Sequence, residues 1–240
     1  MAPMAGVERP QTSREPVAPW WHTALVLAAL AGLSLASRRE NGLPNLHLPG
    51  MDVRLSSYLT VIAAEWLLVL VIWLALRRRG LPIGSLVSGR WPSARAFFRD
   101  LGLAVGFFIA VALPLSLLSS RFAGHADSVA ARITPGTGLQ LLLWLAMSAT
   151  AGFCEEFVFR GYLTRQFSAW SGSCALAIAL QAMIFGLSHG HYNPLVMAVV
   201  ALLGLFLGLL AHWRKSLRPG MLYHGLQDAL GGVVAFFVGS

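Results

Sequence analysis

The chain has 240 residues, of which 56% are hydrophobic and 12% are charged, and it carries a formal net charge of +8. In ordinary soluble domains about 25% of the residues are charged. This composition therefore excludes a soluble domain and indicates an integral membrane protein. The basic residues lie between apolar runs, as the flanks of membrane spans do, and this arrangement argues against nucleic-acid binding.

Seven apolar segments are long enough for membrane-spanning helices, and residues 1–19, rich in Pro and mixed in charge, are predicted to form a disordered head. The segments are 20–37, 57–76, 98–119, 138–158, 171–189, 194–213 and 219–238. The first could be a signal peptide because "SLAS" ends it, but its flanking Trp and Arg pairs favour a retained span. The sequence predicts an all-α, polytopic transmembrane helical bundle of about seven spans (six to eight), with a three-helix membrane region at 20–137 and a helical core at 138–238.

Two further patterns concern orientation and helix packing. Thirteen of the 18 Lys and Arg residues fall on one side when the spans alternate, which predicts a cytoplasmic N-terminus, in a bacterial inner membrane if the host is bacterial. The third and sixth spans carry Gly102-x3-Gly106 and Gly204-x3-Gly208, a spacing that favours close packing between helices inside the bundle.

Charged residues interrupt the fourth apolar segment in "AGFCEEFVFRGY", residues 151–162. A charge at the bilayer centre costs at least about 2.5–3.5 kcal/mol and usually has a function. With 100° between successive helical residues, Glu156 and Arg160 share a face and are predicted to form an ion pair, whereas Glu155 points elsewhere and is available as a general base. The alternative is that both glutamates only neutralise arginines at the membrane surface.

Two histidine patterns follow in the later spans. Phe185 and His189 lie one helical turn apart in "MIFGLSHG", and His224 and Asp228 do so in "RPGMLYHGLQDAL". A carboxylate beside a buried His can fix its tautomer. Packing explains each pattern alone, but together with Glu155 they predict one polar site of a carboxylate and two imidazoles.

Taken in order, the three motifs resemble those of the CPBP family of CAAX proteases and bacteriocin-processing enzymes, also called the ABI or Rce1-like family, over roughly residues 138–238. They read Glu155-Glu156-x3-Arg160, Phe185-x3-His189 and His224-x3-Asp228. The resemblance implies an intramembrane endopeptidase that hydrolyses a peptide bond of a membrane-associated protein or peptide, either prenylated or a transmembrane tail. The expected partners are this substrate and the lipid bilayer, and no nucleic acid.

The resemblance also implies roles for the site residues. Glu155 would activate water, His189 would help to hold it, and His224 with Asp228 would stabilise the oxyanion, while Glu156, Arg160 and Phe185 support them. Family members more often carry Asn at the last position. An ionised Asp cannot donate a hydrogen bond, so Asp228 is expected either to be protonated or to orient His224.

Two mechanisms stay open. Glu155 and His189 can activate water without a metal, or Glu155, His189 and His224 can hold a divalent ion such as zinc, whose bound water is the nucleophile. The metal-free mechanism is favoured because the His-Glu-x2-His motif of common zinc proteases is absent from the sequence.

Two other functions also stay open: a transporter in which Glu65, Glu155 and Asp228 form a proton relay, and a non-catalytic scaffold such as an immunity protein. Glu65 lies in the middle of the second span and has no predicted catalytic role.

The depth of the groups in the membrane sets a condition on the predicted site. Simple alternation of the spans places Glu155 and His224 in the inner half of the membrane and His189 at the outer end. The site therefore requires the fifth helix to start late, tilt or stop inside the bundle, and the fourth to continue past Arg160. Under that condition Glu155, His189 and His224 are predicted to lie within several ångströms of one another.

Overall fold

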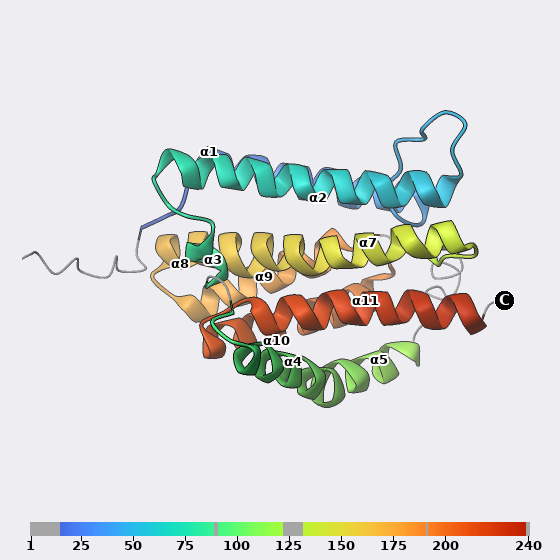
Figure 1. Ribbon diagram of the computed structural model, residues 1–240. Helices are drawn as coiled ribbons and strands as arrows, with labels where there is room; N and C mark the ends of the chain where they lie inside the picture. The colour runs from blue at the N-terminus through green and yellow to red at the C-terminus, as the bar shows by residue number, and fades with distance from the viewer. Residues whose placement is uncertain (1–14, 89–90, 122–131, 191, 239–240) are drawn as a thin grey trace, which may run out of the picture.

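In the computed structural model, residues 15–88, 91–121, 132–190 and 192–238 are described, and they form a bundle of helices (Figure 1). The elements are α1 Trp20–Glu40, α2 Val53–Arg78, α3 Gly84–Val87, α4 Ala94–Phe107, η1 Phe108–Ala112, α5 Leu113–Ser120, α7 Gly138–Glu155, η2 Glu156–Leu163, α8 Thr164–Ser171, α9 Cys174–Ser188, α10 Pro194–Arg214 and α11 Arg218–Val238. The two η elements are π-helical.

Within these ranges, six helical stretches are long and apolar enough to cross a membrane. They are Trp20–Glu40, Val53–Arg78, Ala94–Leu118, Gly138–Ser171, Pro194–Arg214 and Arg218–Val238. The apolar helix α9 is shorter, with 15 residues. These helices confirm the predicted all-α, polytopic bundle of about seven spans.

Side-chain caps account for several of the helix starts that build the site. Thr137 caps α7 by accepting a hydrogen bond from the Gln140 N–H, and Ser173 caps α9 in the same way. Asn193 caps α10, with a Pro at its first position, where the missing N–H costs nothing. These caps fix where the chain re-enters the bundle on either side of the motifs.

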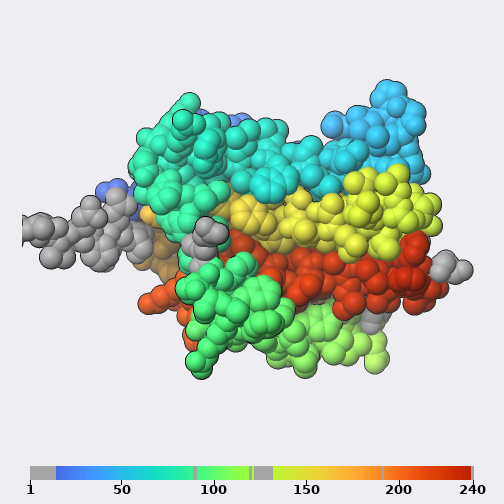
Figure 2. All heavy atoms as spheres, in the orientation of Figure 1, coloured from blue at the N-terminus to red at the C-terminus, as the bar shows by residue number. Residues whose placement is uncertain are grey.

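Helix α7 occupies the middle of the bundle, because it packs against both α2 and α11. Helix α11 in turn packs against α4, and α9 packs against α8 and α10. Figure 2 shows α11 on one face of the molecule, between α7 and the green α4–α5 stretch.

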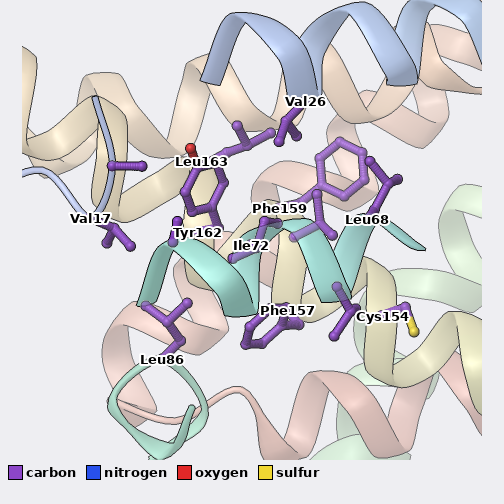
Figure 3. Close-up of a cluster of buried hydrophobic side chains, with 14 of the residues drawn as sticks. Val17, Val26, Leu68, Ile72, Leu86, Cys154, Phe157, Phe159, Tyr162 and Leu163 are labelled. Carbon is purple, nitrogen blue, oxygen red and sulfur yellow. The ribbon is translucent and has the colours of Figure 1, made fainter. Parts of the chain in front are cut away.

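A core of buried apolar side chains joins α1 and α2 to the stretch from α7 through η2 (Figure 3). In this core Ile72 of α2 is fully buried, as are Phe157 and Leu163 of η2. The Tyr162 hydroxyl lies 2.8 Å from His22 Nδ1 and 2.8 Å from Thr23 Oγ1, both on α1. The predicted regions 20–137 and 138–238 therefore share one core.

The chain just before α1 corrects one boundary. Residues 1–14 of the predicted disordered head lie outside the described residues, but Val17 and Ala18 are each 1% exposed. Their N–H groups donate to Gln166 Oε1 at 2.7 and 3.2 Å. Residues 17 and 18 thus belong to the bundle, and α1 packs in its core.

The fourth and fifth spans differ from their predicted bounds. The fourth was expected to end at residue 158, but α7, η2 and α8 run on without a break to Ser171. The fifth was expected over 171–189, but α9 covers only Cys174–Ser188, and its C-cap is His189. Because 15 residues span only about 22 Å, α9 is shorter than a bilayer core of about 30 Å.

Glycines allow the closest helix contacts. A Cβ on Gly152 of α7 would lie 2.7 Å from the Gly225 nitrogen of α11, so these two backbones touch. Gly204 and Gly208 likewise face α9 side chains, as their spacing predicts. The same prediction is wrong for Gly102 and Gly106, which face open space on α4.

Candidate active site

A cavity of about 310 Å³ lies within the bundle and is lined by side chains of α1, α2, α7, α9, α10 and α11. Most of its lining is apolar. Its lining includes all four residues that the sequence predicts to be catalytic, which are Glu155, His189, His224 and Asp228. Two further ionisable side chains, those of Glu65 and Tyr192, also line it. Residues far apart in the sequence thus face one cavity.

Helix lengths explain how His189 reaches the depth of Glu155. Glu155 precedes the end of the long helix at Ser171 by 16 residues, or roughly 24 Å. His189 follows the start of α9 at Cys174 by 15 residues, or roughly 22 Å. Because the two helices are joined by the tight turn at Gly172 and Ser173, their equal rises bring both side chains to one level.

Glu156 and Arg160 form the expected ion pair, with 2.8 Å between Glu156 Oε1 and Arg160 Nη1 and no exposure of either side chain. The Arg160 guanidinium also lies over the Phe185 ring, 4.1 Å from its centroid. A cation is stabilised by a carboxylate and by the face of an aromatic ring. Phe185 therefore supports the site by holding Arg160.

Glu155 faces the cavity instead, as its position on the helix predicts. Its side chain is 22% exposed, and its Oε2 lies 3.6 Å from His224 Nε2. Among the described residues, Glu155 forms no ion pair with an arginine or lysine. Its carboxylate is consequently available to take a proton.

His189 is oriented by the helix that it ends. Its Nδ1 lies 2.8 Å from the Phe185 carbonyl oxygen, so Nδ1 carries the hydrogen that it donates there. In a neutral ring, Nε2 is then an acceptor. The Tyr192 ring stacks on His189 with an interplanar angle of 7°. Burial, and then the Asp228 carboxylate, raises the pKa of the Tyr192 phenol to about 12, so this hydroxyl stays protonated at neutral pH.

His224 connects the paired and the unpaired glutamate. Its Nδ1 lies 3.3 Å from Glu156 Oε1, which fixes one side of the ring. Its Nε2 lies 3.6 Å from Glu155 Oε2 and 3.6 Å from Asp228 Oδ2. A proton on Nε2 can therefore be donated toward the cavity, at a point that Asp228 also reaches.

The metal mechanism needs three protein ligands that face one point. Within the described ranges, no group of three or more His, Cys, Asp or Glu side chains is arranged so that it could hold a metal ion. The ligand set of Glu155, His189 and His224 is not preassembled in the described part of the chain, and the choice between the two mechanisms stays a prediction.

Sequence reasoning missed three features of the site. Glu65 was noted without a partner, but it lines the same cavity as Glu155. The contact between Glu156 and His224 joins helices 68 positions apart in the chain, so no local spacing signals it. Gln227 lines the cavity with a buried Oε1 that has no hydrogen-bond partner, and only its place next to Asp228 hinted at a role.

Comparisons with known proteins agree with the motifs. Residues 137–230 match a family model described as "Type II CAAX prenyl endopeptidase Rce1-like". That region runs from the cap of α7 through His224 and Asp228 in α11 and excludes α1, α2, α4 and α5. The comparisons with curated proteins and with solved structures gave no match. The resemblance read from the three motifs is confirmed.

Proposed function

We propose that this member of the Rce1-like family uses its cavity to hydrolyse a peptide bond of a membrane-associated substrate without a metal ion. Membership of the family implies a peptidase that acts within the membrane. One observation carries the assignment of the residues: Glu155, His189, His224 and Asp228, from two helices and the end of a third, line a single cavity.

The first step is the activation of water. Glu155 takes a proton from a water molecule that also donates a hydrogen bond to His189 Nε2, and the oxygen attacks the substrate carbonyl. In hydrocarbon the protein must supply both partners, because bulk water is absent. The proton then passes from Glu155 to the leaving amine, so the base is restored when the C–N bond breaks.

The second requirement is stabilisation of the oxyanion. His224 acts as an imidazolium, with a hydrogen on each ring nitrogen: Nδ1–H donates to Glu156, and Nε2–H donates to the oxyanion. Since Glu156 already orients His224, an orienting role for Asp228 would be redundant. Asp228 therefore acts in its protonated form as the second donor, at the position where relatives more often carry Asn.

The substrate is a membrane protein or a lipidated peptide, either prenylated or a transmembrane tail, because the cavity is enclosed by membrane helices and lined mostly by apolar side chains. The protein lies in the plasma membrane with its N-terminus on the cytoplasmic side. The distribution of Lys and Arg supports the cytoplasmic N-terminus. The chain enters α1 at one end of the bundle and leaves α11 at the other (Figure 1), which places the two termini on opposite sides.

Cleavage of quenched prenyl-peptide and membrane-helix substrates by the purified protein tests the proposal. Glu155→Gln, His189→Ala and His224→Ala should each lower kcat by about 10²–10⁴-fold, with monodispersity and melting checked for each. Glu40→Gln, at an exposed ion pair with His47, is the matched control and should keep full activity. Chelators should leave cleavage unchanged. Inhibition of cleavage by a chelator, reversed by added zinc, would overturn the metal-free mechanism.

The transporter alternative keeps one supporting observation, because Glu65, Glu155 and Asp228 line the same cavity. Reconstitution in liposomes with an internal pH dye separates the two functions. Proton flux that depends on these carboxyls, with no cleavage of either substrate class, would favour transport. Loss of cleavage in Glu155→Gln, His189→Ala and His224→Ala, with no proton flux through the wild type, would favour the peptidase.

A further inference from the structure

A group of basic side chains that the proposed reaction does not use lies at the end of the bundle where α4 and α11 begin. Arg95 and Arg99 lie one turn apart on α4, and Arg218 is the first residue of α11. Arg214 is the last residue of α10, and Lys215 follows it. Helix α4 packs against α11, and Figure 1 shows both helices starting at the same end. These five side chains form the basic cluster.

A buried carboxylate holds part of the basic cluster in place. The Asp100 side chain has no exposure, and its Oδ1 lies 2.7 Å from Arg214 Nη2. Its Oδ2 lies 3.3 Å from Arg218 Nε and accepts a hydrogen bond from Trp91 Nε1 at 3.1 Å. Because donors from three parts of the chain fix this carboxylate, it keeps the two guanidinium groups at defined positions.

The basic cluster carries more positive charge than Asp100 balances. Arg99 adds another guanidinium, whose Nε lies 3.8 Å from Asp100 Oδ1 and whose side chain is 59% exposed. Arg95 and Lys215 are exposed as well. One carboxylate therefore accompanies five cations, and like charges at such short range repel one another. An anion beside Arg99 and Arg214 would reduce this repulsion.

The position of the basic cluster indicates which anion it meets. The membrane-spanning stretches begin at Ala94 and Arg218 and end at Arg214, so the cluster lies where these stretches leave the hydrocarbon. Trp91 and Trp213 flank it and are 37% and 68% exposed, and Trp is enriched at membrane–water interfaces. Anionic phospholipids present phosphate groups at this depth, and a guanidinium binds phosphate through two parallel hydrogen bonds.

We propose that the basic cluster binds the phosphate headgroup of an anionic phospholipid, with Arg99 and Arg214 contacting the phosphate and Asp100 holding Arg214 in position. Arg95 and Lys215 add attraction without fixed geometry. A zwitterionic headgroup carries its own cation, so it gains less from the surplus positive charge. The bound lipid joins α4 to the turn between α10 and α11, and this role does not depend on the peptidase activity.

Titration of a fluorescent phosphatidylglycerol into the purified protein in neutral detergent tests the proposal. Each basic side chain near an anionic headgroup contributes enough that Arg99→Gln should weaken binding about fivefold, and Arg99→Gln combined with Lys215→Gln about 25-fold. Arg39→Gln, exposed at the other end of the bundle, is the matched control and should change binding less than about twofold. Melting curves check the fold of each variant. If Arg99→Gln melts early, Lys215→Gln alone should still weaken binding about fivefold.

Competitors identify the anion. Unlabelled phosphatidylglycerol should displace the probe, whereas phosphatidylcholine and inorganic phosphate should displace it far less. Added salt should weaken binding, because exposed charges are screened. Equal displacement by phosphatidylcholine, or equal losses in Arg39→Gln and Arg99→Gln, would overturn the proposal. Displacement by inorganic phosphate as strong as that by phosphatidylglycerol would show a site for soluble phosphate and would overturn the assignment to lipid.

Discussion

The contact between Gly152 and Gly225 predicts a large effect from a very small substitution. A Cβ on Gly152 would lie 2.7 Å from the Gly225 nitrogen and 2.8 Å from the Met221 oxygen. Ordinary Cβ contacts begin near 3.4 Å. Gly152→Ala therefore requires α11 to move away from α7 by about 0.7 Å, because both obstructing atoms belong to the backbone of α11 and cannot rotate aside.

This movement would separate the reacting groups. His224 precedes Gly225 on α11, and its Nε2 lies 3.6 Å from Glu155 Oε2 on α7. A misplacement of about 1 Å at a catalytic site can lower the rate about 10²-fold, so Gly152→Ala should lower kcat by one to two orders of magnitude. Overpacking should also cost about 1–3 kcal/mol of stability.

The assay is cleavage of the quenched substrate together with thermal melting in the same detergent. Gly102→Ala is the matched control, since nothing lies within 4 Å of the added Cβ on α4. It should keep kcat and gain up to about 1 kcal/mol, as alanine does in a helix. Wild-type activity and melting in Gly152→Ala, or an equal loss in Gly102→Ala, would refute the reasoning.

Three further predictions concern the oxyanion site and the end of the bundle at which α1 begins. Asp228→Asn should keep kcat within about threefold because its amide still donates, whereas Asp228→Ala should lose about 10²–10³-fold. The fully buried Asp100 side chain pairs with Arg214 at 2.7 Å and with Arg218 at 3.3 Å. Asp100→Asn should therefore lower the free energy of unfolding by about 3–5 kcal/mol. An unchanged melting curve would contradict this prediction. Gln166→Leu should release residues 17 and 18, which limited proteolysis would detect as faster cleavage before α1.

The number and type of the spans followed from the sequence because hydropathy reports what a helix presents to lipid. The lengths of the fourth and fifth spans did not follow. An apolar window ends where polar residues begin, yet Gln166 lies beyond that limit and is fully buried in the bundle, where it holds Val17 and Ala18. Polarity marks the edge of a membrane only for side chains that face outward, so the depth of His189 could not be read from hydropathy.

The parts of the site that lie within one helix followed from spacing alone. The pairing of Glu156 with Arg160 is an example, because residues four apart share a helical face. Contacts between helices, such as that of Glu156 with His224, depend on the rotation and height of each helix. Close backbone contacts such as that of Gly152 with Gly225 set the rotation and height of each helix. A single sequence does not show which residues make such contacts.

A site inside a membrane must supply its own counter-charges, and here two adjacent glutamates divide that work. Arg160 neutralises Glu156, and the same Glu156 oxygen also faces His224 Nδ1. The opposite nitrogen of that ring faces Glu155, so the fixed ion pair sets the orientation of a group that contacts the unpaired acid. Because successive residues on a helix differ by 100°, the two glutamates cannot exchange places. The proposed mechanism therefore needs both acids in this order: an arginine neutralises one, and the other has no arginine partner among the described residues and can gain and lose a proton.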